Sequence, residues 1–149
     1  MGLLDGHRAV VTGGGSGIGR ATCRAMAREG AAVTVLDVNG DSAAATAGEV
    51  DGRPFAVDVT DAAALEGAIR DAANALGGLT LLFNNAGAST MAAIHEWDVD
   101  EWDRVVALNL GGVFHGLRVG APLIVESGGG AVVSTASLSG TRPAAGEAP

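Results

Sequence analysis

A glycine-rich turn near the start of the chain limits the fold more than any other feature. The apolar run Arg8–Thr12 leads into Gly13-Gly14-Gly15-Ser16-Gly17-Ile18-Gly19, and a helical pattern follows. The first amides of a helix lack intrahelical partners and carry partial positive charge, so this junction predicts a pyrophosphate-binding loop. We expect Gly13 to turn the chain off the strand, Gly17 to admit a phosphate, and Gly19 to let the helix pack closely on the sheet.

Apolar runs and helical patterns alternate through the rest of the chain, which predicts right-handed βαβ units. Further strands are expected at 32–36, 55–59, 79–83 and 131–135, and helices at 18–28, 41–50, 61–76 and from Asp98 or Asp100 to about 119. Thr60 or Asp61 is expected to cap the third helix, and Pro122 to kink or end the fourth. The pattern predicts one α/β domain, a Rossmann-type doubly wound parallel sheet with five strands.

Asp37 closes the second predicted strand, where a carboxylate can accept hydrogen bonds from an adenosine ribose. The same charge would repel a 2′-phosphate, so we expect the cofactor to be NAD rather than NADP. The alternative interpretation is an ordinary solvated carboxylate at a strand end.

Two motifs together resemble those of the classical short-chain dehydrogenase/reductase family of nicotinamide-dependent oxidoreductases. They are Thr12-Gly13 followed by Gly17-x-Gly19, and Asn84-Asn85-Ala86-Gly87 directly after the fourth predicted strand. The resemblance implies a structural Asn84, and it implies cofactor contacts from Gly13, Gly15, Ser16, Gly17, Ile18, Gly19, Asp37, Asp58, Val59, Asn85, Ala86 and Gly87. Ser16 occupies a position that is often basic in relatives that accept the 2′-phosphate.

The resemblance also implies two catalytic residues. Ser137 stands where the family's catalytic serine stands, with Ser134 and Ser139 as its rivals. Asn109 lies among apolar helical neighbours, and the matching family residue holds a water in a proton relay; an Asn satisfied by local backbone is the alternative. His95 is expected to be an exposed loop residue and not a base.

The family's active-site Tyr would follow Ser137 by thirteen residues, one position beyond Pro149, with a Lys four further on. The chain contains no Tyr. We therefore expect the N-terminal part of a family domain, lacking its last strands and inactive by itself. A catalytically inactive dinucleotide-binding module is the alternative; a methyltransferase would share the glycine loop and the acidic ribose ligand, but nothing after the fourth strand favours it.

Composition limits the partners. The net charge of −8 argues against nucleic acid or an anionic membrane, so any phosphate must be held by backbone amides. A single cysteine, Cys23, excludes an intrachain disulfide framework and is expected to be a small buried residue. We expect a cytoplasmic protein without a membrane span or a metal, acting on a small alcohol or ketone. The family resemblance implies that the parent is a homo-oligomer, a dimer or tetramer, that pairs through the long fourth helix.

Overall fold

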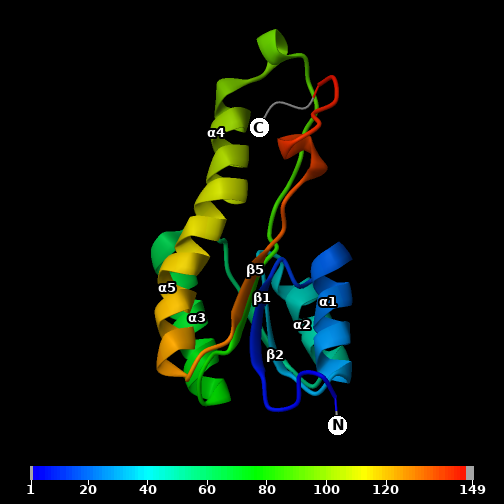
Figure 1. Ribbon diagram of the computed structural model, residues 1–149. Helices are drawn as coiled ribbons and strands as arrows, with labels where there is room; N and C mark the ends of the chain where they lie inside the picture. Colours follow the sequence, from blue (N-terminus) through cyan, green and yellow to red (C-terminus); the bar gives the residue numbers. More distant parts are fainter. Residues whose placement is uncertain (1, 147–149) are drawn as a thin grey trace.

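Five parallel strands form one sheet in the computed structural model, which describes residues 2–146 (Figure 1). The strands are β1 (Arg8–Thr12), β2 (Ala32–Asp37), β3 (Arg53–Ala56), β4 (Leu81–Asn84) and β5 (Ala131–Ser134), in the spatial order β3-β2-β1-β4-β5. Central β1 pairs on both sides, so that Val10 lies opposite Thr34 of β2 and Leu82 of β4. The predicted Rossmann-type parallel sheet is confirmed.

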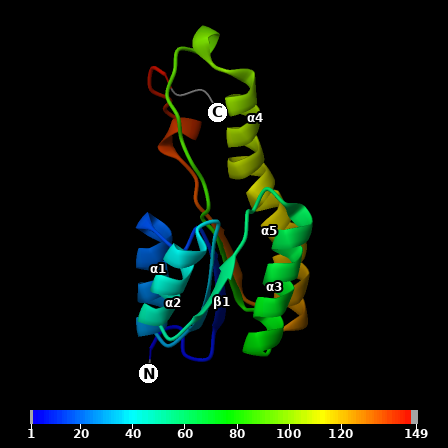
Figure 2. The ribbon, with the colours of Figure 1, turned by 180° about the vertical axis from the view of Figure 1, so that it is seen from behind.

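Helices cover both faces of the sheet. The helices α1 (Gly17–Arg28) and α2 (Gly40–Glu49) lie on one face, and α3 (Ala62–Leu76) and α5 (Gly112–Glu126) lie on the other (Figures 1 and 2). Successive side chains of β1 enter opposite cores: Val10 packs in the core beneath α3 and α5, and Val11 in the core beneath α1 and α2. Burial on both faces explains why the β1 sequence is continuously apolar rather than alternating.

The helix caps follow the local sequence. Of the two predicted caps of α3, Asp61 is the one used: it accepts hydrogen bonds from the N–H groups of Ala63 and Ala64, both at 3.0 Å. Gly77 ends the same helix in the left-handed conformation, with φ 75°. Asp98, rather than Asp100, caps α4 (Val99–Val106).

The fourth predicted helix is longer than expected. It runs without a break through α4, the π-helical turn η2 (Ala107–Gly111) and α5, with Pro122 inside α5. Proline removes one hydrogen bond to the carbonyl of residue 118. Both Arg118 and Pro122 are exposed, so water can satisfy that carbonyl, and the prediction that the helix ends near residue 119 is wrong.

Three buried glycines bring α5 close to the sheet. A Cβ on Gly112 would stand 2.6 Å from Val59 Cγ2, one on Gly116 would stand 3.1 Å from Asn84 Cγ, and one on Gly120 would stand 2.6 Å from Leu82 Cδ2. By length and composition alone the helix Val99–Glu126 could cross a membrane. Gly116 and Gly120 on this helix pack against β4.

The bounds of β3 and β4 differ most from the prediction, whereas β2 and β5 each differ from it by one residue at the end. The strand β3 covers Arg53–Ala56 rather than 55–59, because β2 ends at Asp37, opposite Ala56, and leaves no partner for longer pairing. The strand β4 begins at Leu81 and includes Asn84. Because β3 ends early, Asp58 and Val59 lie in a loop and not in a strand.

The segments after β4 and β5 extend beyond the sheet beside α4 (Figure 1). They contain the single turns η1 (Ile94–Glu96) and η3 (Leu138–Gly140), and the Ala92 N–H donates to the Gly146 carbonyl at 2.9 Å. The long helix keeps exposed apolar side chains: Val99 72%, Trp102 39%, Leu110 68%, Phe114 59%, Leu117 39% and Val125 76%.

Candidate functional site

The predicted cofactor loop lies at the point where the strand order reverses. The chain runs from β1 outward to β3, then returns to the other side of β1 as β4. Ligands of open α/β sheets bind beyond the carboxyl ends of the strands at such a switch point. The loop after β1 and the loop after β4 meet there.

The glycines of the loop are required by shape. Gly13 and Gly17 have positive φ values of 62° and 47°, which favour glycine. A Cβ on Gly13 would stand 2.8 Å from the Ala86 Cα, and one on Gly19 would stand 2.7 Å from the Gly13 carbonyl carbon. Gly19 therefore lets α1 begin directly against the loop, whereas its expected role was close packing on the sheet.

The first turn of α1 faces outward. Ser16 is its N-cap, and no side chain among residues 2–146 caps the turn. The first helical bond runs from the Arg20 N–H to the Ser16 carbonyl at 2.9 Å. Ile18, which the resemblance implies as a cofactor contact, is 66% exposed and so available to a ligand. Amides at such an open helix start suit a phosphate.

Asp37 is held in place by the loop it is predicted to serve. Its Oδ2 accepts the N–H of Gly15 at 2.9 Å, and its Oδ1 accepts the N–H of Asn39 at 3.0 Å. A Cβ on Gly15 would meet Oδ2 at 2.9 Å, so glycine is required for this approach. The carboxylate is oriented and only half-buried, as a ribose ligand would need.

Asp58 and Val59 follow β3 and face opposite ways. Asp58 is exposed, and its Oδ1 accepts hydrogen bonds from Thr60 N at 2.9 Å and Thr60 Oγ1 at 2.8 Å. Val59 is 5% exposed and its side chain packs in the core against Gly112. Because the Val59 side chain is buried, only its main chain is available for the predicted contact with a cofactor.

Thr12 is a site residue that the sequence reasoning left without a role. Its side chain is 2% exposed, and its Oγ1 accepts the N–H groups of Asn85 at 2.9 Å and Ala86 at 3.1 Å. The hydroxyl therefore joins the end of β1 to the start of the loop after β4. A polar residue closing an apolar strand was the signal that could have indicated this.

Two consecutive asparagines, Asn84 at the end of β4 and Asn85 directly after it, differ in their hydrogen bonding. Asn84 is 2% exposed, and neither of its side-chain polar atoms has a hydrogen-bond partner within residues 2–146. The Asn85 side chain, predicted to face the cofactor, donates to the carbonyls of Thr12 at 3.2 Å and Gly13 at 3.3 Å, and accepts from Thr135 Oγ1 at 3.0 Å. Asn85 thus joins the ends of three strands, while Gly87 remains exposed.

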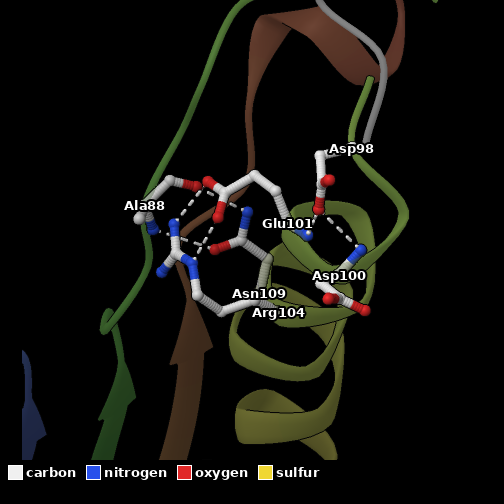
Figure 3. Close-up of polar contacts among 6 residues, drawn as sticks. All are labelled: Ala88, Asp98, Asp100, Glu101, Arg104 and Asn109. Carbon is white, nitrogen blue, oxygen red and sulfur yellow. Dashed lines mark hydrogen bonds and ion pairs between the residues drawn. The ribbon is translucent and has the colours of Figure 1, made fainter. Parts of the chain in front are cut away.

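Asn109 lies in the π turn η2 and grips the loop after β4. Its Oδ1 accepts the Ala88 N–H at 3.0 Å, and its Nδ2 donates to the Ala88 carbonyl at 2.8 Å (Figure 3). The Asn109 side chain is thus satisfied by main-chain groups, but these belong to a residue distant in the sequence and not to the local backbone of its own helix. Turns of the π type are frequent at functional sites.

An ion pair lies beside this contact. Arg104 donates to both carboxylate oxygens of Glu101 at 2.7 Å (Figure 3). This hydrogen bonding is the main cause that lowers the pKa of Glu101 and raises the pKa of Arg104, and a side-chain hydrogen bond from Thr90 lowers the Glu101 pKa further. Glu101 therefore connects α4 to the same loop that Asn109 holds.

Ser137 is exposed after β5 and opens the turn η3. Its Oγ accepts the Ser139 N–H at 3.1 Å and lies 3.0 Å from the Ser139 Oγ. Ser139, a rival for the catalytic role, thus helps to orient Ser137. Ser134 lies on the edge strand, paired with Asn84. No hydrogen bond joins Ser137 to Asn109 among the described residues.

Other reactive groups contribute little to the site. Burial raises the pKa of the Cys23 thiol to about 12, so this cysteine is an inert core residue. His95 is exposed in η1, as expected, and lies 3.9 Å from Glu96. Within residues 2–146, no group of three or more His, Cys, Asp or Glu side chains could hold a metal ion.

Comparison with known proteins assigns the family. The profile of the short chain dehydrogenase family matches residues 7–149, and the chain belongs to this family. It is 38% identical to the 2,5-dichloro-2,5-cyclohexadiene-1,4-diol dehydrogenase of Sphingobium indicum over 97% of its length. It is 41% identical, over 93%, to the 2-dehydro-3-deoxy-L-rhamnonate dehydrogenase (NAD(+)) of a Sphingomonas species.

A solved structure gives the same result. The carveol dehydrogenase of Mycobacterium avium, solved in complex with NAD, superposes with a TM-score of 0.93 at 29% identity, covering 99% of this chain. The chain spans 60% of that protein and 60% and 57% of the two relatives above. The matched residues 7–149 include the glycine loop, the Asn84-Asn85 pair, Asn109 and Ser137.

Proposed function

We propose that this chain is the cofactor-binding part of an NAD-dependent oxidoreductase that transfers hydride between the nicotinamide and a secondary alcohol or ketone carbon. The observation that carries the proposal is the oriented Asp37 carboxylate, held by Gly15 and Asn39 beside an uncapped helix start. Its relatives are dehydrogenases, one named for NAD(+), which supports the same chemistry.

The residues present fit a dinucleotide. The amides at the start of α1 would hold the pyrophosphate, Asp37 would accept the ribose hydroxyls, and Asp58 would meet the adenine. The loop from Asn85 to Gly87 would face the nicotinamide. The bound nicotinamide would supply or accept the hydride.

Ser137 and Asn109 would act on the other side of the reaction. The Ser137 hydroxyl donates its one hydrogen to the Ser139 Oγ in this structure, and on substrate binding it would turn that hydrogen to the substrate oxygen. Asn109 would hold the loop at Ala88 and, through the π turn, a water on the proton path. In the family a Tyr phenol, its pKa lowered by a nearby Lys, serves as the acid or base, and residues 1–149 contain no Tyr.

The proposal extends to partners and location. We propose a homo-oligomer formed through the exposed apolar face of the long helix, supported by Trp102, Leu110 and Phe114. The negative net charge argues against nucleic acid and anionic membranes, and a single, buried cysteine fits the reducing cytoplasm.

Cofactor titration tests the proposal. We expect NADH to bind about tenfold or more tightly than NADPH, because Asp37 accepts hydroxyls and repels a phosphate. Replacement Asp37→Ala should bring the two affinities together, while Asp41→Ala, an exposed carboxylate in the first turn of α2, should leave the ratio unchanged. Equal affinities in the unmodified protein would refute the assignment.

A further inference from the structure

A histidine on α5 holds the loop that carries Asp58. His115 is half-buried, and its Nδ1 lies 3.1 Å from the Val59 carbonyl oxygen. A carbonyl oxygen only accepts hydrogen bonds, so Nδ1 carries the hydrogen and donates. The contact links residues 56 positions apart in the sequence.

Two residues on one face of α5 contact the same loop residue, Val59. Gly112 packs on the Val59 side chain, and His115, three residues further along the helix, binds the Val59 carbonyl. Among residues 2–146, no other hydrogen bond joins this loop to α5. The histidine therefore fixes the peptide plane between Val59 and Thr60, and the Thr60 N–H of that plane donates to the Asp58 carboxylate.

The Asp58 carboxylate has one free oxygen. Its Oδ1 is engaged by Thr60, whereas its Oδ2 has no hydrogen-bond partner among the described residues. An ionised carboxylate oxygen accepts hydrogen bonds and cannot donate them. At the carboxyl edge of the sheet it would accept from the exocyclic amino group of an adenine and would repel a keto oxygen at the same place.

We propose that His115 is a positioning residue of the adenine subsite: by donating to Val59 it fixes the direction of the Asp58 carboxylate and so sets the preference for an amino group on the bound base. This inference rests on the proposed function, since it requires that a dinucleotide binds at this edge. It makes His115 a determinant of base recognition without direct contact with the base.

The test compares NAD with nicotinamide hypoxanthine dinucleotide, which has a keto oxygen in place of the adenine amino group. We expect the unmodified protein to bind NAD about tenfold more tightly, the size of one hydrogen bond to a charged group. His115→Leu should reduce this ratio to about one. His115→Asn places an amide N–H near the position of Nδ1 and should keep the ratio.

Control variants make the outcome decisive. His115→Gln keeps a polar side chain of similar size, but its amide stands one carbon further from the backbone and cannot donate to the Val59 carbonyl in the same way. It should therefore lose the preference for NAD, and it provides the test if His115→Leu fails to fold. His95→Leu, on the exposed turn η1, should change nothing. If the unmodified protein binds no NAD, the proposed function fails. If it binds NAD no more tightly than the hypoxanthine dinucleotide, or if His115→Gln keeps the preference for NAD, the role of His115 is refuted.

Discussion

Replacing Thr12 by valine should separate the hydrogen-bonding role of this residue from its packing role. Valine has nearly the shape of threonine but no oxygen, so the N–H groups of Asn85 and Ala86 would lose their acceptor. An unsatisfied buried donor costs about 1–3 kcal/mol. Because Asn85 and Ala86 are only half-buried, water recovers part of this cost, and we expect a total loss of about 2–3 kcal/mol.

Thr12→Ser provides the matched control, because serine keeps the oxygen and loses one methyl group, which costs about 1 kcal/mol. Urea unfolding followed by circular dichroism measures both variants. With an m-value of about 2 kcal/mol per molar, Thr12→Val should lower the midpoint by about 1 M or more, at least twice the shift for serine. Equal shifts for the two variants would show that the hydroxyl does not join β1 to the loop after β4.

Three further predictions follow from the structure. In the full-length parent, Ser137→Ala should lower turnover by about 100-fold with little change in cofactor affinity, whereas Ser139→Ala, which only orients Ser137, should be mild; the reverse order would mean that the catalytic serine is misplaced. Hydrogen bonds from Arg24 and then Arg20 lower the Glu49 pKa from 4.5 to about 2, so Glu49 should stabilise the fold above pH 4.5 and lose that contribution as the pH falls through about 2. Glu49→Gln should flatten this part of the stability profile, and an unchanged profile by thermal melting would contradict the ion pair. Residues 1–149 expressed alone should show no dehydrogenase activity over a panel of secondary alcohols, and measurable turnover would show that another residue donates the proton.

The parts of the fold that depend on local sequence were predicted well. The glycine turn, the Asp61 cap and the end of α3 at Gly77 follow from backbone geometry that neighbouring residues set. The doubly wound parallel sheet was predicted because parallel strands with right-handed crossovers leave few arrangements, but the strand order itself was not predicted. The predictions were wrong where the surroundings in the fold set an element's end. The strand β3 stops at Ala56 because its neighbour β2 ends at Asp37. The long helix continues through Pro122 because this part of the helix is exposed to water.

The sequence by itself determined the class of fold and the identity of the loop residues, because spacing, glycine and strand polarity are local properties. The tertiary structure alone decided what each polar side chain does. Asn85 is engaged by three strand ends, Asn109 by Ala88, and Thr12 and His115 acquire roles through residues far along the chain. Hydrogen bonds depend on distances of a few tenths of an ångström between segments that only folding brings together, and no spacing in the sequence encodes those distances.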